Sequence, residues 1–553
     1  MKTGADTNDT AILPRMTAAM KAAVMTPPAL PPGHVPSCYQ QAVYDNVASG
    51  KGHTVVEAFA GSGKTTTMLI ALGFVPRGST IVMVAFNKSI ATELAGRAPR
   101  GVDVKTLHSH GFSAVRRALP GVTVEGDKTW HIVDTLCGGD YEHAAGIVKL
   151  VGVAKDTLTA LRLVRENLAT KIGTKSLFWE ARNSLEALDA LVDTFEIDCP
   201  DDDADRARFV EAAARVLVRS AQMKTKQTKP NGGDPMLFPA EKEPETSTLS
   251  VIDFSDMCWL PIVHNFRVWA YDRVFMDETQ DMNPCQIALV LKMVRPGGRI
   301  CAVGDEKQEL YAFRGADATM SGLIETLGAT VLQLSITYRC PRAVVRLAQL
   351  AVPGLEAAPN AIEGVVTNAN KDYMLTHAEA GDMIISRSNG PLIEICLALM
   401  VRGKRASIMG RNVGEGLARL ITRSKAKSLK SLDVWMAMWA AKEAARLLKK
   451  KRDPQIAFDQ KSCIDALCED AESIAEVLER ANKLFSDNEG GKITLGTTHK
   501  LKGLEADRVW MLEGTYRRQR GGAEEACWYV AVTRAKKELI LTSLPKKEER
   551  QSS

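Results

Sequence analysis

Short apolar runs alternate with amphipathic segments along this chain of 553 residues. The first runs are Thr-Val-Val-Glu at 54–57 and Thr-Ile-Val-Met-Val-Ala-Phe at 80–86, and residues 105–110 close a third strand-and-helix unit. Repeated units of this kind favour a parallel sheet with helices on both faces. From about 115 to 223 the pattern becomes mostly helical, as in 207–217. We therefore expect a first α/β domain that a helical insertion interrupts.

The β-prone pattern returns after a polar stretch, Lys224 to Thr248, which we interpret as a mobile loop that ends the insertion. Strands are predicted at 250–254 and at 271–276, and the second of these is apolar enough to be buried. Both strands are expected to complete the first α/β domain.

A second α/β region is predicted to begin near Val331 and to continue at 382–386. The pattern breaks around Gly410, gives way to a basic helical stretch and resumes as a strand at 492–495. The predicted fold is therefore α/β, with two sheet domains that each carry a mainly helical insertion. The predicted division is a flexible segment 1–36, a first sheet domain 37–114 with 250–328, its helical insertion 115–249, a second sheet domain 329–410 with 491–545, its small helical insertion 411–490, and a tail 546–553.

A loop of small residues follows the first predicted strand. Residues 58–65 read Ala-Phe-Ala-Gly-Ser-Gly-Lys-Thr, with Ala58 where the general pattern of such loops has glycine. A strand, a glycine-rich loop and a helix form the context of a phosphate-binding loop, whose backbone N–H groups surround a polyphosphate at a helix N-terminus. We predict that Lys64 reaches the β- and γ-phosphates of ATP and that the Thr65 hydroxyl ligates Mg²⁺. The predicted nucleotide-binding residues of the loop are Ala60, Gly61, Ser62, Gly63, Lys64, Thr65 and Thr66.

Two adjacent carboxylates follow the buried run 271–276. Ligands of open α/β sheets bind at the carboxyl ends of the strands. Asp277 is suited to hold Mg²⁺, directly or through water, and Glu278 to orient and deprotonate the water that attacks the γ-phosphate. The alternative is a solvated turn, which the glycine-rich loop in the same chain disfavours.

Composition places few limits on the function. Hydrophobic residues make up 45% of the chain and charged residues 25%, and the formal net charge is +5, so a nucleic-acid surface has to be a local basic patch. The eleven cysteines lack paired CxxC spacing, which favours reduced thiols over a zinc site or a disulfide framework. We find neither a membrane-spanning run nor a signal peptide, and we expect a cytoplasmic protein, or a nuclear one if the source is a eukaryote.

Further segments have residue types that a nucleotide-driven motor needs. Gln308 follows a predicted strand and is suited to sense the γ-phosphate. Tyr311, Phe313 and Arg314 offer two aromatic rings and a guanidinium group for base stacking and phosphate contact. Arg339 and Arg534 lie in the second α/β region, where arginines that face a nucleotide across a cleft stabilise charge on the transferring phosphoryl group.

Taken together, these segments resemble the motifs of superfamily 1 DNA helicases of the UvrD/Rep type, and the chain is most similar to the helicase portion of the F-box DNA helicases, although we recognise no F-box. The matches run in the family's order from about Gln40 to Leu541. The matching stretches are 39–43, the glycine-rich loop, 85–90, 106–109, 277–281, 304–316, 338–339, 498–505 and 529–535. The resemblance implies two RecA-like domains and an ATP-dependent DNA helicase.

The resemblance also implies roles for single residues. Gln40 should read the adenine, Tyr338 should stack on it, and Glu505 should contact the ribose or nearby phosphates. Arg339 and Arg534 would be the γ-phosphate arginines. The residues expected along single-stranded DNA are Phe86, Asn87, Thr106, His108, Tyr311, Phe313, Arg314 and His499, and for each aromatic side chain the alternative is core packing.

Some positions depart from the family's pattern. Phe86 is one residue closer to the following Asn-Lys than is usual, Ala506 replaces an aromatic residue, and Lys500 stands where a small residue is common. The basic stretches 423–427 and 449–452 either contact duplex phosphates or form a solvated helix face. Trp435 and Trp439, four residues apart, are expected in the core of the small insertion rather than in a base-stacking platform.

The predicted function is an ATP-dependent DNA helicase that moves on single-stranded DNA, with the 3′ to 5′ polarity that the resemblance implies, in repair, recombination or replication. Expected partners are single-stranded and tailed duplex DNA, and no membrane. The main alternative is a single-strand translocase that displaces bound proteins with little unwinding. A motor subunit of a nuclease complex and a non-enzymatic P-loop switch are further alternatives, and the intact catalytic residues disfavour the switch. Charge and spacing do not exclude an RNA substrate, which only the family resemblance disfavours.

Overall fold

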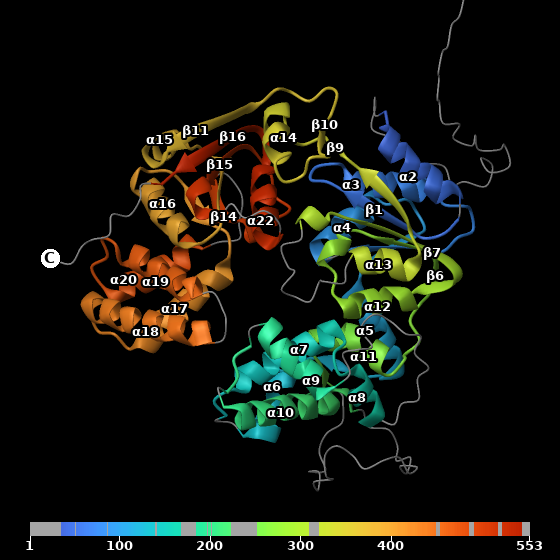
Figure 1. Ribbon diagram of the computed structural model, residues 1–553, viewed down its shortest axis with the longest axis horizontal. Helices are drawn as coiled ribbons and strands as arrows, with labels where there is room; N and C mark the ends of the chain where they lie inside the picture. The colour runs from blue at the N-terminus through green and yellow to red at the C-terminus, as the bar shows by residue number, and fades with distance from the viewer. Residues whose placement is uncertain are drawn as a thin grey trace, which may run out of the picture.

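The computed structural model consists of two α/β lobes, each with a helical insertion on its lower side in the view of Figure 1. The residues that the structure describes are 35–49, 51–85, 87–138, 141–167, 184–195, 197–200, 202–222, 251–308, 320–449, 454–485, 492–517 and 522–544. Every helix in these ranges is too short or too polar for a transmembrane segment.

The first lobe is built on a six-stranded parallel sheet in the order β3-β2-β6-β7-β1-β8. Its strands are β1 Thr54–Ala58, β2 Ile81–Ala85, β3 Val102–Thr106, β6 Tyr271–Met276, β7 Val294–Gly304 and β8 Thr330–Leu334. The helices of this lobe are α2 Cys38–Ser49, α3 Lys64–Ala71, α4 Lys88–Arg97, α5 Leu107–Ala118, α11 Phe254–Val263, α12 Pro284–Lys292 and α13 Met320–Leu327. The strands predicted at 54–57, 80–86 and 271–276 are confirmed, and β2 is buried along its whole length.

Two expectations for this lobe are wrong. The run near Val331 does not open the second region, because β8 pairs in parallel with β1 and forms an edge of the first sheet. The strand predicted at 250–254 is reduced to β5 Val251–Ile252, which pairs with β4 Thr123–Val124 outside the main sheet. Asp253 ends this strand, because its side chain accepts from the Asp256 backbone N–H and the Asp256 side chain accepts from that of Asp253, a capping box that begins α11.

The second lobe has its own six-stranded parallel sheet, in the order β11-β16-β15-β12-β14-β13. Its strands are β11 Val365–Asn370, β12 Met383–Ser386, β13 Ala406–Ile408, β14 Ile493–Thr497, β15 Ala506–Leu512 and β16 Ala535–Ser543. The helices are α14 Arg342–Ala348, α15 Lys371–His377, α16 Gly390–Val401, α21 Thr498–Leu501 and α22 Gly522–Val532, and the short pair β9 Ile336–Thr337 and β10 Glu356–Ala357 connects the lobes. Strands β12 and β14 confirm the runs predicted at 382–386 and 492–495.

Both insertions are helical, as the pattern indicates. The first contains α6 Lys128–Cys137, α7 Ala144–Thr157, α8 Leu161–Asn167, α9 Leu185–Thr194 and α10 Asp203–Ala221, and the second α17 Arg411–Ser424, α18 Leu429–Lys449, α19 Gln455–Cys468 and α20 Ile474–Leu484. Trp435 and Trp439 stack with ring centroids 6.4 Å apart and pack, partly buried, against the core of the second insertion. Arg446 of α18 forms an ion pair with Asp198, so the two insertions touch each other.

A buried ion network fixes the first insertion to the sheet domain. Lys155 Nζ of α7 lies 2.7 Å from Asp253 Oδ2 and 2.8 Å from Asp256 Oδ1, and Lys128 Nζ of α6 lies 2.5 Å from Asp256 Oδ2. Lys128 also donates to the Ser220 carbonyl of α10 at 2.8 Å. Burial alone would lower the pKa of Lys155, but Asp256 and Asp253 outweigh it and raise that pKa. The network thus pairs two cations with two carboxylates at the start of α11, where breaking one pair leaves a charge buried.

We predict that Asp256→Ala lowers the free energy of unfolding by roughly 3–5 kcal/mol, because two buried ammonium groups then share one carboxylate. The matched control is Glu93→Ala, which breaks the exposed helix pair of Glu93 with Arg97 and is expected to change stability by less than about 0.5 kcal/mol. Urea unfolding followed by circular dichroism measures both. Equal midpoints for the two variants would contradict a stabilising network.

Candidate nucleotide-binding site

The glycine-rich loop between β1 and α3 lies against the segment that leads into the second lobe. Gly61 and Gly63 have left-handed backbone conformations, with φ of 70° and 78°. A Cβ atom on Gly61 would lie 2.6 Å from both Arg339 Cβ and Thr337 Oγ1, and the Tyr338 backbone N–H donates to the Gly61 carbonyl at 2.8 Å. Glycine is therefore required at 61 both by its backbone conformation and by this close approach.

The acidic pair stands where β6 ends, as predicted, and meets the loop. Thr65 Oγ1 donates to Asp277 Oδ2 at 2.8 Å, so the two expected Mg²⁺ ligands are already side by side. Burial, and then the neighbouring Glu278 carboxylate, raises the pKa of Asp277 to about 6. A buried carboxylate of this kind gains from a nearby divalent cation, so the chemistry of the donor set fits Mg²⁺.

Glu278 is held in a strained and charged state. Its φ is 50°, a left-handed conformation that is uncommon for a residue with a side chain. Burial alone would raise the pKa of Glu278, but Lys64 and a hydrogen bond of 2.6 Å from Gln280 Nε2 to Glu278 Oε2 are the main factors that lower it. The carboxylate is thus ionised at neutral pH, as a proton acceptor has to be.

Arg534 reaches the site from the second lobe through a buried position before β16. Its Nη2 donates to Gln308 Oε1 at 3.3 Å, its Nη1 to the Leu504 carbonyl at 3.3 Å and its Nε to the Val530 carbonyl at 2.8 Å. Burial, and then the nearby Arg339, lowers the pKa of Arg534 to about 10. The side chain therefore remains a cation at neutral pH, fixed by the backbone around it.

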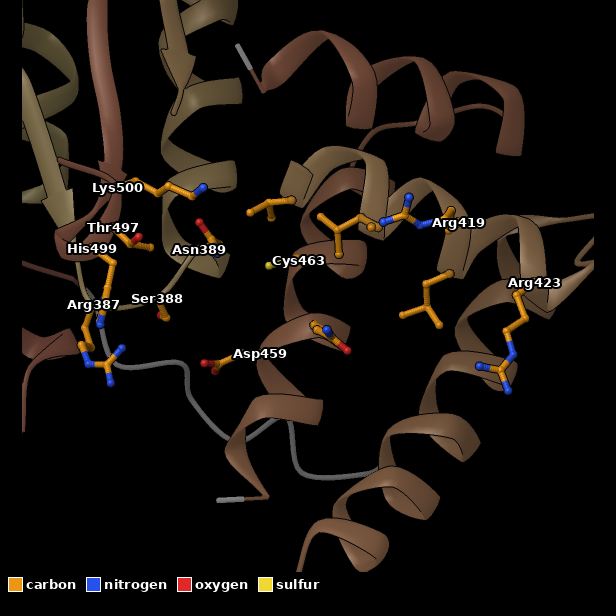
Figure 2. A pocket seen from close by; sticks show the side chains of 15 residues that line it. Arg387, Ser388, Asn389, Arg419, Arg423, Asp459, Cys463, Thr497, His499 and Lys500 are labelled. Atoms are coloured by element: carbon orange, nitrogen blue, oxygen red, sulfur yellow. The ribbon is translucent and has the colours of Figure 1, made fainter. Parts of the chain in front are cut away.

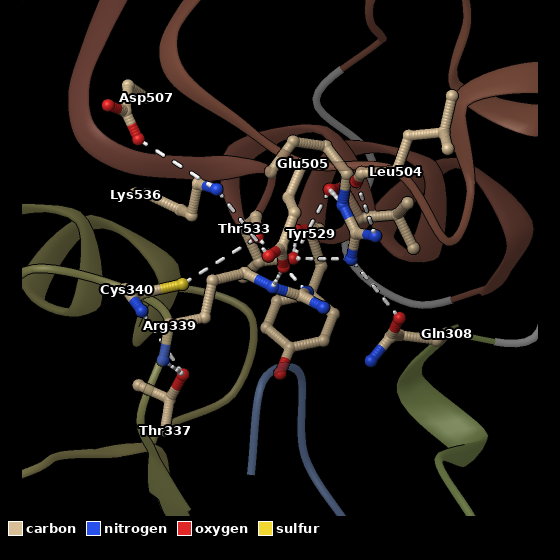
Figure 3. Close-up of polar contacts among 12 residues, drawn as sticks. Gln308, Thr337, Arg339, Cys340, Leu504, Glu505, Asp507, Tyr529, Thr533 and Lys536 are labelled. Atoms are coloured by element: carbon tan, nitrogen blue, oxygen red, sulfur yellow. Dashed lines mark hydrogen bonds and ion pairs between the residues drawn. The ribbon is translucent and has the colours of Figure 1, made fainter. Parts of the chain in front are cut away.

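Arg339 is the second guanidinium group at the site (Figure 3). Its Nε donates to Glu505 Oε2 at 2.5 Å and its Nη1 to the Thr533 carbonyl at 3.5 Å. Glu505 also has Lys536 Nζ at 3.7 Å from its Oε1. Glu505 thus orients Arg339 here and is not among the residues that line the nucleotide cavity; its contact with the ribose or phosphates stays a prediction.

Most of these groups line one cavity of about 470 Å³ between the lobes, whereas Asp277 and Glu505 are not among its lining residues. The first lobe contributes the loop and Glu278, and the second contributes Arg339 and Arg534. The full lining consists of Gly61, Ser62, Gly63, Lys64, Thr65, Thr66, Asn87, Ile90, Glu278, Asp281, Gln308, Arg339, His499, Lys500, Lys502, Gly503 and Arg534. The buried Ser62 Oγ has no hydrogen-bond partner among the described residues, so a polar group is still needed there. Lining and donors fit a magnesium-bound triphosphate.

The two residues expected at the adenine lie together at one end of the loop. Tyr338 OH donates to Gln40 Oε1 at 3.3 Å, and Gln40 Nε2 donates to Thr67 Oγ1 at 3.2 Å. Both side chains lie within 4 Å of the position that a Cβ atom on Gly63 would take. Gln40 is buried whereas Tyr338 is 46% exposed, so the tyrosine ring retains an accessible face.

The residues predicted along DNA are placed less completely. Asn87 and Thr106 cap helices, where their side chains accept from the backbone N–H groups of Ile90 and Ser109, and Asn87 also lines the nucleotide cavity. His108 is partly buried, which lowers its pKa. His499 lines the nucleotide cavity and a second cavity described below. Phe86, Tyr311, Phe313 and Arg314 lie outside the described residues.

Three further residues of the site were not predicted from the sequence. Tyr529 OH accepts from the Ala60 backbone N–H at 3.0 Å, and Lys502 Nζ lies 2.8 Å from Asp281 Oδ1, so both side chains cross between the lobes. Gln280 Oε1 accepts from the Asp305 N–H at 3.0 Å. All three lie within the matched motifs, but only their partners in space reveal what they do.

Comparison with known protein families agrees with this geometry. The UvrD/REP helicase N-terminal domain matches residues 40–325, which is more than half of the chain. The UvrD-like helicase C-terminal domain matches residues 421–546. The two matches together cover the loop, the acidic pair and Arg534.

The sequence identity to individual relatives is low. The F-box DNA helicase 1 of Gallus gallus is 23% identical over 528 residues, which are 88% of this chain and 47% of that protein. The F-box DNA helicase protein 1 of Schizosaccharomyces pombe is 24% identical over 529 residues, 88% of this chain and 55% of that protein. The ATP-dependent DNA helicase PcrA of Bacillus subtilis is 31% identical over 107 residues, 18% of this chain and 14% of that protein. The chain thus spans about half the length of the two F-box relatives.

The two domain matches, together with the cavity that both lobes line, show that the chain belongs to the UvrD/REP helicase family.

Proposed function

We propose that this protein is an ATP-dependent DNA helicase that moves 3′ to 5′ on single-stranded DNA and acts in DNA repair, recombination or replication. The observation that carries the proposal is the convergence of Lys64 and Glu278 from one lobe with Arg339 and Arg534 from the other around a single cavity. Because residues from both lobes form the site, the rate of hydrolysis depends on the relative position of the two lobes. A motor requires this coupling between hydrolysis and lobe movement. Polarity and pathway rest on the family resemblance.

In the hydrolytic step, Glu278 orients a water molecule and accepts its proton while the oxygen attacks the γ-phosphorus of ATP. The bond from the γ-phosphorus to the bridging oxygen breaks, and ADP keeps that oxygen. Lys64, Arg339 and Arg534 stabilise the charge that develops on the phosphoryl oxygens. Mg²⁺, held by Thr65 and Asp277, would neutralise β- and γ-phosphate charge.

A chain of hydrogen bonds supports coupling between the lobes and the proton acceptor. Arg534 donates to Gln308, and Gln308 Nε2 donates to Asp305 Oδ2 at 2.5 Å. The Asp305 N–H donates to Gln280, which in turn donates to Glu278. We infer that movement of the second lobe shifts Arg534 and so alters the orientation of Glu278, which makes hydrolysis sensitive to the grip on DNA.

Lys64→Ala should reduce ATP turnover by about 10²-fold or more, because a preorganised charge at the phosphates is lost, while single-strand binding stays largely intact. Steady-state ATPase assays and DNA-binding titrations measure the two properties. Lys51→Ala, at an exposed lysine of the same lobe, is the control and should turn over normally. Robust turnover by Lys64→Ala would refute the site assignment.

Glu278→Gln should bind ATP almost as tightly as the wild type yet hydrolyse it at least about 10²-fold more slowly, because the amide keeps the shape but cannot accept the proton. Equilibrium binding of a fluorescent ATP analogue and single-turnover hydrolysis separate the two effects. The control Glu93→Gln changes an exposed carboxylate. Wild-type hydrolysis by Glu278→Gln would remove this residue as the base.

Tyr529→Phe should favour separated lobes in the absence of nucleotide, because the Ala60 N–H loses its acceptor across the lobes. A lost hydrogen bond of about 0.5–1.5 kcal/mol shifts the closed-to-open ratio about two- to tenfold. Energy transfer between dyes on the exposed Cys38 and on a cysteine introduced at Val401, which is 88% exposed, reports this ratio. Tyr516→Phe removes a hydroxyl that bonds to Thr498 within the second lobe, and an equal shift in this control would contradict the prediction.

The function itself is tested by the ATPase rate with and without single-stranded DNA, followed by unwinding of 3′-tailed and 5′-tailed duplexes. Stimulation by single strands and unwinding of the 3′-tailed duplex alone support the proposal. Stimulation and displacement of a bound protein without unwinding would support the translocase instead. Equal stimulation of the ATPase by RNA and by DNA would broaden the substrate class. An ATPase rate that neither nucleic acid changes would refute the proposed motor function.

A further inference from the structure

A second cavity, of about 660 Å³, lies between the second sheet and the small helical insertion (Figure 2). The lobe side of its wall includes Asn389, His499 and Lys500, and helix α17 of the insertion supplies Arg419 and Arg423. His499 and Lys500 also line the nucleotide cavity, so the two cavities are neighbours that share a wall.

The charges in this cavity are uneven. Arg419, Arg423 and Lys500 are exposed, and within the described residues they form neither an ion pair nor a hydrogen bond. Arg387 also lines the cavity but is neutralised by Glu524, with Arg387 Nε 2.9 Å from Glu524 Oε1. Asp459 brings a carboxylate, which accepts from Gln455 Nε2 at 3.2 Å. A surplus of cations thus remains for an anionic ligand.

The two arginines of α17 form a regular row. They lie four residues apart and therefore on one side of the helix, about 6 Å apart along its axis. Ile421 of the same helix is buried in the apolar core that the insertion shares with the second sheet, which fixes how the helix faces the cavity. Cations spaced along one wall are suited to successive phosphates of a nucleic-acid backbone rather than to one small anion.

The cavity also offers what a nucleobase needs. Asn389 Oδ1 is buried and has no hydrogen-bond partner among the described residues, so it is an unused acceptor for an amino or imino group. Val413, Leu417 and Leu420 give the same cavity an apolar surface. Bases in a duplex are stacked and paired, whereas a single strand can bring both its phosphates and an unpaired base into such a space.

We propose that Arg419 and Arg423 of the small insertion, together with Lys500 of the second lobe, bind successive phosphates of single-stranded DNA in this cavity. The proposal rests on the proposed DNA-motor function and extends it to residues outside the matched motifs, apart from Lys500, which departs from the family's usual small residue. It also replaces one interpretation of the basic stretch 423–427: Arg423 serves the single strand, not the duplex. Because Lys500 borders both cavities, DNA bound here lies next to the ATP site.

The test is the double variant Arg419→Gln/Arg423→Gln, compared with Lys425→Gln/Lys427→Gln. The control loses the same charge from exposed lysines that follow α17 and do not line the cavity. Fluorescence anisotropy with a labelled single-stranded oligonucleotide is measured over a range of salt concentrations. The arginine variant should weaken binding and reduce the slope of log K against log salt by about 0.7 for each phosphate that is no longer neutralised, with blunt-duplex affinity and DNA-free ATPase unchanged. The control should keep the wild-type slope.

Three outcomes would overturn the inference: wild-type slope in the arginine variant, an equal loss in the lysine control, or a loss of duplex affinity instead. Lys500→Ser provides an independent variant, because Lys500 lies in α21 and not in α17. The loss of its phosphate contact should raise the DNA concentration that gives half-maximal ATPase stimulation. Unchanged stimulation in this variant would remove Lys500 from the site. Failure of the wild-type protein to bind single strands would instead refute the proposed function itself.

Discussion

The hydrogen-bonded path from Arg534 to Glu278 is the constraint on which the rest of this molecule depends. A guanidinium group buried between lobes is costly unless its donors find acceptors, and here two backbone carbonyls and Gln308 provide them. The same fixed geometry that stabilises the cation also orients it toward the phosphate-binding loop. Stability and chemistry at the cleft therefore have one cause, and neither lobe alone can assemble the site.

The two sheets reach this cleft through different strand ends, because the first uses the carboxyl ends of β1 and β6 whereas Glu505 and Arg534 of the second lobe stand just before β15 and β16. Parallel strands end at one edge, so the loop after β1 and the acidic pair after β6 meet without long connections. The insertions leave these sheets at their loops and are fixed by separate interactions, through the buried ions of Lys155, Asp253 and Asp256 in the first lobe and through apolar packing in the second. Their ion pair between Arg446 and Asp198 links the outer parts of the molecule as well.

Much of the catalytic side of this arrangement could be predicted from the sequence because short local motifs carry it. A glycine-rich loop with Lys64 and Thr65, or a carboxylate pair after an apolar strand, has a chemical meaning that few other patterns share.

The sheet to which each strand belongs was harder to predict. Nothing in the run Val331 to Leu334 tells which sheet it joins, because only the crossover connection decides that, and β8 joined the first. The strand predicted at 250–254 failed for a local reason: the reciprocal caps of Asp253 and Asp256 begin a helix where β-branched residues favoured a strand. The partners of Tyr529 and Lys502 could not be predicted either, because Ala60 and Asp281 lie in the opposite lobe, far away in the sequence.

The fit around Gly61 has a mechanical consequence. Even a methyl group there would overlap Arg339 and Thr337, so the loop and the start of the second lobe touch without slack. Two bodies that touch without a gap cannot absorb small displacements between them. If the loop widens around a polyphosphate, Arg339 and Thr337 have to move with it. A small displacement of the loop is therefore transmitted to the second lobe.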